Sequence, residues 1–204
     1  MPRIKIALSA VALIAVVAAA LPPAHAEGLT VPVKGGSRMC LTAPAAHRLT
    51  EAGIALRAGG PARLTGRDRT CVDLPVTRGA VSLDLAKGGA AMDGSIIFEG
   101  RRQSLTLSDL YSHPGRTRTS AEATVGRGRA RPIDLLDYTV TPEHFRVGVT
   151  QIKATDVAMK LTRSGADVFT EAFGTSPLRP GEQLFSGEAT VDLIRSTTGA
   201  LGSR

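Results

Sequence analysis

Two short apolar runs set the pattern of this sequence: Gly94-Ser95-Ile96-Ile97-Phe98-Glu99-Gly100 and, four residues later, Ser104-Leu105-Thr106-Leu107-Ser108-Asp109-Leu110. In the second run Leu105 and Leu107 alternate with polar residues, which places both on one face of an extended strand. Similar runs rich in Val, Ile, Leu and Thr recur between glycines and prolines along most of the chain. Such regular punctuation is typical of a β-protein.

Working outward from these two runs, we expect strands over residues 29–33, 38–42, 54–57, 71–76, 80–85, 95–99, 104–110, 120–125, 133–140, 145–149, 157–161 and 184–193. In the run 80–85, Val81, Leu83 and Leu85 alternate with polar neighbours and would share a face. No stretch between residues 27 and 193 has the composition of a linker. The sequence therefore predicts a single all-β domain over 27–195, mainly antiparallel, as a sandwich or an open barrel with two short helices.

The two expected helices cover residues 44–52 and 163–173, and they are related in sequence. Both segments follow the frame L-T-x-x-x-A-x-x-[L/F]-T-E-A, which begins at Leu41 and again at Leu161, 120 residues later. Thr42 is a candidate N-cap for the first helix, and a glycine closes each helix, Gly53 and Gly174. The repeated frame predicts two copies of one strand–helix unit.

Residues 1–26 have the features of a cleavable secretory signal. Arg3 and Lys5 precede an apolar run over residues 6–21, and Ala24-His25-Ala26 then supplies an A-x-A cleavage site. The run is shorter than a membrane span needs, which disfavours a retained anchor. Cleavage after Ala26 lowers the formal net charge from +7 to +5, because the segment has two basic and no acidic residues. We expect a secreted or envelope protein without a membrane span in its mature part, and a disordered tail over 196–204.

Cys40 and Cys71 are the only cysteines of the chain. In an exported protein an even count favours one disulfide over two free thiols. A metal site is not predicted, because these cysteines and the scattered His47, His113 and His144 lack metal-ligand spacing.

A catalytic function is not predicted either. The sequence lacks a nucleophile elbow, a zinc-protease motif, a phosphate loop and a penicillin-binding serine motif. Ser112, His113 and Asp109 could form a hydrolase set in space, but nothing in their spacing singles them out. We therefore expect a protein that is not an enzyme.

Arginine is concentrated in the middle of the chain, which raises the question of an anionic partner. A solvated basic surface and a site for an envelope polyanion are both consistent with this concentration. Nucleic acid is disfavoured because the chain is exported and only 3% aromatic, which leaves few side chains for base stacking. The arginines concerned are Arg101, Arg102, Arg116, Arg118, Arg127, Arg129 and Arg131.

Segments 75–84, 94–100 and 105–109, together with segments of the second half up to about residue 193, resemble the haem-transport-associated, or HtaA-like, domains of secreted and envelope actinobacterial proteins. In the second half, Leu161-Thr162-Arg163-Ser164-Gly165-Ala166 resembles the closing L-T-x-x-[AG]-A helix of the family, and Pro180-Gly181-Glu182 resembles its turn before the last strand.

The resemblance implies a β-rich extracellular domain, and some members bind haem through a Tyr supported by a His. Here Arg101 stands where the family tends to have that His, and the opening segment lacks the ligand Tyr. Tyr111 and His113 are candidate substitute ligands, because they would share one face of an extended strand. His113 or Arg116 could stabilise the charge of a Tyr111 phenolate. Tyr138 and His144 form a poorer set. Tyr111, His113, Arg116 and Arg101 are thus the tentative ligand-binding residues.

Three functions are consistent with the sequence. The first is a non-catalytic envelope module that binds an apolar ligand, with haem as the named candidate and weak binding expected. The second is a structural or protein-interaction module without a small-molecule ligand. The third is a hydrolase without a recognisable motif.

Overall fold

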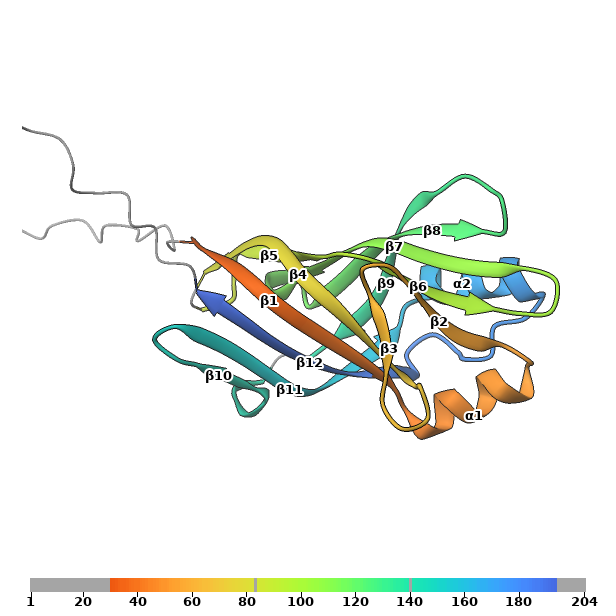
Figure 1. The fold of residues 1–204 in the computed structure, drawn as a ribbon, viewed down its shortest axis with the longest axis horizontal. Coiled ribbons are helices and arrows are strands. Elements are labelled where there is room, and N and C mark those ends of the chain that lie inside the picture. Colours follow the sequence, from red (N-terminus) through yellow and green to blue (C-terminus); the bar gives the residue numbers. More distant parts are fainter. Residues whose placement is uncertain (1–29, 83, 140, 194–204) are drawn as a thin grey trace, which may run out of the picture.

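The structure is a computed structural model that describes residues 30–82, 84–139 and 141–193 (Figure 1). The predicted signal sequence 1–26 and the tail 196–204 lie outside these residues. The strands are β1 (Thr30–Leu41), β2 (Ala55–Gly59), β3 (Arg63–Thr65), β4 (Cys71–Ser82), β5 (Gly88–Met92), β6 (Ser95–Glu99), β7 (Ser104–His113), β8 (Arg118–Val125), β9 (Arg131–Tyr138), β10 (Phe145–Val147), β11 (Gln151–Leu161) and β12 (Gln183–Leu193). The helices are α1 (Ala43–Glu51) and α2 (Arg163–Phe173), with 3₁₀ turns at Pro114–Arg116 and Pro142–His144.

The strands form one antiparallel sheet that closes on itself. Eight strands follow one another around the ring in the order β7-β5-β4-β1-β12-β11-β9-β8, and pairing between β8 and β7 completes it. The remaining strands extend this ring, since β6 and β2 continue from β7, β3 pairs with β4, and β10 pairs with β11. The all-β fold with two short helices is confirmed, and of the two expected architectures the sheet is a barrel, closed rather than open.

The interior of the barrel is filled by side chains, as expected for a ring of eight strands. Phe98 of β6 packs against Phe169 of α2, with ring centroids 4.8 Å apart, and against Phe185 of β12 at 6.4 Å. The largest side chains with almost no exposed surface are Phe98, Phe169, Phe185, Met39, Leu49, Leu74, Ile96, Leu105, Leu107, Leu110, Leu135 and Leu136.

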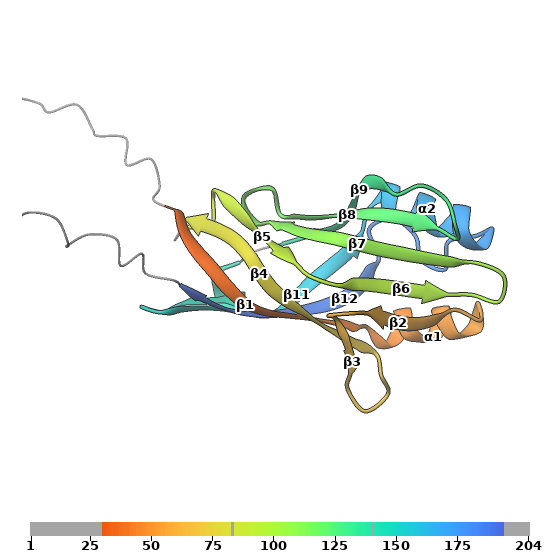
Figure 2. The same ribbon diagram turned by 45° about the horizontal axis from the view of Figure 1, so that its top comes forward.

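Both helices lie at the same end of the barrel, and β1 begins and β12 ends at the other end (Figures 1 and 2). Thr42 caps α1 by accepting a hydrogen bond from the Ala45 amide, as predicted, and Thr162 caps α2 through the Gly165 amide. Gly174, with φ of 84°, ends α2 in the left-handed conformation. Among the described residues, no helix is long and apolar enough to cross a membrane.

Several strand boundaries differ from the expected ones. The expected strands 71–76 and 80–85 are parts of a single strand, β4, which stops at Ser82 because the chain turns there. The Asp84 carboxylate accepts hydrogen bonds from the Ser82 hydroxyl and the Ala86 amide, and Leu85 has a positive φ of 59°. Leu85 therefore lies beyond the strand, but it still packs against the buried cluster that contains Val81. Leu83 lies outside the described residues. Strands β3 and β5 were not predicted.

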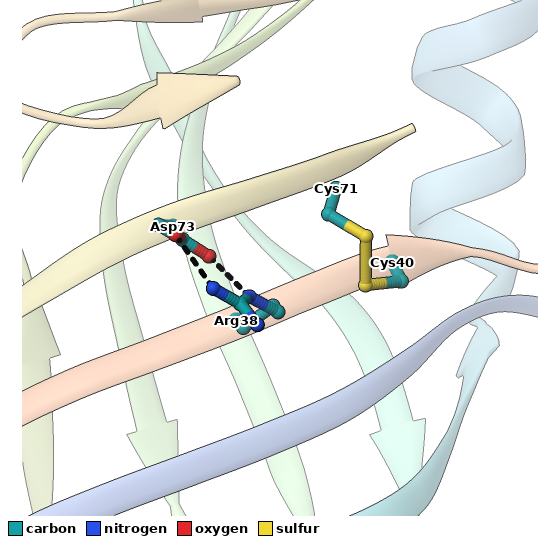
Figure 3. The surroundings of a disulfide bond; sticks show 4 residues. All are labelled: Arg38, Cys40, Cys71 and Asp73. Atoms are coloured by element: carbon teal, nitrogen blue, oxygen red, sulfur yellow. Dashed lines mark hydrogen bonds and ion pairs between the residues drawn. A yellow bond between two sulfur atoms is a disulfide. The ribbon is translucent and has the colours of Figure 1, made fainter. Parts of the chain in front are cut away.

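The predicted disulfide between Cys40 and Cys71 is present, with an S–S distance of 2.12 Å. The two residues are directly opposite each other on β1 and β4. Figure 3 shows the bond on these two neighbouring strands, one step along from the paired side chains of Arg38 and Asp73.

Candidate functional site

A hollow of about 510 Å³ lies at the helical end of the barrel, and we call it the helix-end hollow. Its walls come from three places: Ala52 and Ile54 after α1, the β6–β7 turn at 100–103, and the end of α2 from Glu171 to Gly174. Gly100 permits the turn to approach the helix, because a Cβ at this position would lie 2.9 Å from the ring of Phe173. The hollow thus combines apolar side chains with the polar turn that carries Arg101.

Arginines from two neighbouring turns surround this end. The β6–β7 turn carries Arg101 and Arg102, and the β8–β9 turn carries Arg127 and Arg129. Pairing of β7 with β8 brings the two turns together, and the Gly126 amide donates to the Ser104 carbonyl at 2.8 Å. All four arginines are exposed, and none forms an ion pair with a residue that the structure describes.

The one carboxylate in the lining of this hollow already has a partner. Glu171 of α2 accepts from Arg131, the first residue of β9. Its negative charge is therefore offset, and the unpaired arginines give the mouth of the hollow a positive potential. This arrangement suits an anion.

The same hollow suits an iron centre poorly. Its lining contains no Tyr, His, Cys or Met, which are the side chains that hold haem iron in proteins. Across the described part of the chain there is also no group of three His, Cys, Asp or Glu side chains that could hold a metal ion.

Tyr111 and His113 lie at the far end of β7, and the structure brings their rings together. The ring centroids are 4.5 Å apart, so the predicted common face is correct. The Nε2 atom of His113 lies 3.2 Å from the Ser120 hydroxyl on β8. Burial and the charge of Arg116 lower the pKa of His113, in that order of importance. Both effects favour the neutral form of the imidazole.

This face is the outer one, because β7 has an irregularity. The register with β8 shifts between Ser108 and Tyr111, and Asp109 has a φ of 48°. Leu105, Leu107 and Leu110 consequently all face the core, which leaves Tyr111 on the outside of the barrel.

The irregularity also separates Ser112 from His113. The Ser112 hydroxyl points inward and lies 2.9 Å from the hydroxyl of Tyr138. Burial raises the pKa of Tyr138 to about 12, so the phenol stays protonated at physiological pH. Ser112 and His113 face opposite sides of β7, so the hydrolase set with Asp109 is not formed. In the second predicted ligand set, Tyr138 bonds to Ser112, and His144 bonds to the Thr141 hydroxyl, which lies 2.7 Å from its Nδ1 atom.

The four tentative ligand residues therefore do not form one site. Tyr111, His113 and Arg116 are grouped at one end of β7, whereas Arg101 precedes the other end, about 30 Å away at the rise of an extended strand. Sequence reasoning missed Ile54 and Phe173 as companions of Arg101. The available signal was Gly100, which follows a buried strand and precedes two arginines.

No protein-family model matches the chain, and neither does any curated protein. Among solved structures, the C-terminal domain of HtaA from Corynebacterium glutamicum matches with a TM-score of 0.59 and 18% identity, over 80% of this chain and 99% of that one. The N-terminal domain of the same protein matches with a TM-score of 0.50 and 16% identity, over 79% and 98%. At these identities the matches establish a shared fold.

Proposed function

With the fold of the HtaA domains as the premise, we propose that this chain is a non-catalytic ligand-binding module of the cell envelope. Its ligand is an anion with a large apolar surface, and its site is the helix-end hollow. The envelope location follows from the predicted signal sequence 1–26. The observation that carries the proposal is the pair Arg101 and Arg102 beside the apolar side chains of Phe173 and Ile54.

The chemistry of the site favours ring-and-carboxylate recognition. Arginine binds carboxylates through paired hydrogen bonds, and the aromatic ring of Phe173 provides a flat apolar surface. A tetrapyrrole with carboxylate arms presents both features. Haem is thus the first compound to test, and its carboxylates rather than its iron would be bound, since the lining lacks an axial ligand.

A titration with hemin and with iron-free protoporphyrin tests this directly. We expect both to bind weakly and with affinities within about twofold of each other, because the iron contributes nothing. Replacing Arg101 and Arg102 together by Gln should weaken both ligands about three- to tenfold, the range for two exposed charge contacts. Arg78→Gln on the exposed side of β4 is the matched control, and it should change neither affinity.

The variants Tyr111→Phe and His113→Ala distinguish the two candidate binding sites, the helix-end hollow and the Tyr111–His113 pair. We expect both variants to bind hemin as the parent does. Tight stoichiometric hemin binding that either variant abolishes would assign the site to the Tyr111–His113 pair and contradict the proposal. Absence of binding by either porphyrin would favour a structural or protein-interaction module.

An envelope polyanion is a second candidate ligand, favoured by Arg127 and Arg129 beside the hollow. A polymer would contact both turns, so its affinity should fall steeply as salt is raised. Replacing Arg127 and Arg129 by Gln should weaken a polyphosphate probe and leave the porphyrins unaffected. A polyphosphate affinity that does not change with salt concentration would exclude the polyanion hypothesis.

A further inference from the structure

A second hollow, of about 600 Å³, lies on the outside of the barrel wall, and we call it the outer-wall groove. Its floor is formed by neighbouring residues of β4, β1 and β12, among them Asp73, Arg38 and Glu188. Pro61 and Arg63, from the chain that enters β3, form one side. Figure 2 shows β3 projecting from the wall at this point.

Four charged residues cross the groove in a single row of alternating sign. The pairing registers place Arg63 opposite Asp73, Asp73 opposite Arg38, and Arg38 opposite Glu188. Residues opposite each other in antiparallel strands point to the same face of the sheet. The row therefore runs positive, negative, positive, negative over β3, β4, β1 and β12.

The two inner charges neutralise each other. Arg38 donates from Nε to one oxygen of Asp73 at 2.6 Å and from Nη2 to the other at 3.0 Å (Figure 3). This pairing lowers the pKa of Asp73 and raises the pKa of Arg38. The outer charges, Arg63 and Glu188, are exposed and have no ion-pair partner in the described ranges 30–82, 84–139 and 141–193. The groove thus has a cation at one end and an anion at the other, neither in an ion pair with a described residue, although the charge of Glu188 contributes to the raised pKa of Arg38.

The floor on one side of this row is open, and the strands beneath it are linked to each other. A Cβ added at Gly36 would meet no atom within 4 Å, although Gly36 is paired on both sides, with Pro75 and Thr190. The Cys40–Cys71 disulfide joins the same two strands next to the Arg38–Asp73 pair. The free space above Gly36 therefore belongs to a surface that is already rigid, which limits the entropy lost on binding.

We propose that the outer-wall groove binds a short extended peptide by its two free ends, with the carboxylate on Arg63 and the ammonium on Glu188. Three steps between adjacent strands separate these residues, about 14 Å at the spacing of a β-sheet. An extended chain covers about 3.3–3.6 Å per residue, so a peptide of about four residues fits the separation. This site is independent of the helix-end hollow, and neither proposal depends on the other.

Tetra-alanine with both ends free is the probe, and its acetylated and amidated forms each lack one end charge. Titration of the purified protein, followed by amide chemical shifts, should show the free peptide binding at least about threefold more tightly than either blocked form, a ratio within the range for one exposed charge pair. Glu188→Gln should abolish the discrimination against the acetylated form only. Arg63→Gln should abolish the discrimination against the amidated form only.

Gly36→Phe tests the place of binding. The new ring should fill the groove and abolish binding, while the melting temperature stays close to that of the parent, since nothing lies near the added Cβ. Arg78→Gln on β4 and Glu51→Gln on α1 are charge-matched controls and should bind as the parent does.

Three outcomes would overturn the proposal. Equal affinities for the free and blocked peptides would show that the end charges are not recognised. Unchanged binding by a folded Gly36→Phe variant would place the peptide elsewhere. Alanine as the free amino acid binding as tightly as tetra-alanine would contradict the inferred length.

Discussion

The two strand–helix units share a sequence frame and a capping scheme, yet they have different depths in the molecule. Thr42 and Thr162 each accept a hydrogen bond from an amide three residues ahead and donate to a carbonyl of another segment, Gln183 and Asp134 respectively. Thr50 and Thr170 each donate to the carbonyl four residues back. Local structure is therefore the same in both copies.

Burial is not the same. Helix α1 buries only two residues, Ala45 and Leu49. Helix α2 buries five: Gly165, Ala166, Val168, Phe169 and Ala172. One part of the difference comes from a position that the frame leaves free. Where α2 has the buried Val168, α1 has Arg48, which pairs with Glu182 at the surface. Another part does not depend on residue type, because Ala166 and Ala172 are buried whereas their equivalents at 46 and 52, also alanines, are not. The shared residues therefore specify a capped helix, and its burial depends also on the segments that pack around it.

The largest expected effect follows from this difference in depth. Phe169→Ala removes a ring that contacts Phe98 and Phe173, and it should cost about 3–5 kcal/mol of unfolding free energy. Leu49→Ala, the matched change in α1, should cost about 2–3 kcal/mol because the surrounding side can relax. Denaturant unfolding measures both. Equal losses would mean that the two helices are equally built into the core.

Much of this architecture could be predicted, because periodicity and capping are local. The ranges 163–173 and 95–99 match α2 and β6. Strand β5 was missed because Gly88-Gly89-Ala90-Ala91 lacks strand-forming side chains. Its Gly89 is needed, since a Cβ there would lie 2.3 Å from the ring of Tyr111. That requirement comes from a partner strand and is not visible in the run itself.

The sites were harder to predict for the same reason. Continued alternation from Leu105 and Leu107 would place Tyr111 and His113 on the core side, and the irregularity at Asp109 reverses this. No residue type at 109 marks it. Arg101 was singled out, but its companion Phe173 belongs to a helix about 70 residues away along the chain, and only folding brings the two together.

Loss of the disulfide is the next effect in size, and it should act on the α1 unit. Replacing Cys40 and Cys71 by Ser releases a loop with a sequence separation of 31 and should lower the unfolding free energy by about 3–4 kcal/mol. Because Cys40 directly precedes the last residue of β1 before α1, amide exchange should rise in α1 more than in α2. Uniform acceleration across both helices would contradict this assignment.

Gly165→Ala tests why α2 packs so closely. A Cβ here would lie 2.7 Å from the Leu135 carbonyl oxygen and 2.7 Å from a methyl of Leu161, so the substitution should cost about 1–3 kcal/mol despite the better helix propensity of Ala. The equivalent position in α1 already holds Ala45. The melting temperatures of the variant and the parent measure this effect. A higher melting temperature for Gly165→Ala would show that the space beside Gly165 accommodates a methyl group.

The smallest effect distinguishes the two helices by pH. The backbone amide of Arg179, and then the side chain of Arg48, lower the pKa of Glu182. A carboxyl whose folded pKa is depressed contributes stability above its unfolded pKa of about 4.3, and this contribution disappears as pH falls through the lower folded value. The Glu182 side chain is one-third exposed, at 33%, so screening should keep the contribution below about 1 kcal/mol. Acidification from pH 6 to pH 3 should therefore increase amide exchange in α1 relative to α2, after correction for intrinsic exchange rates. Glu182→Gln should remove this pH-dependent difference, and a parent protein in which both helices respond alike would show that Glu182 does not secure α1.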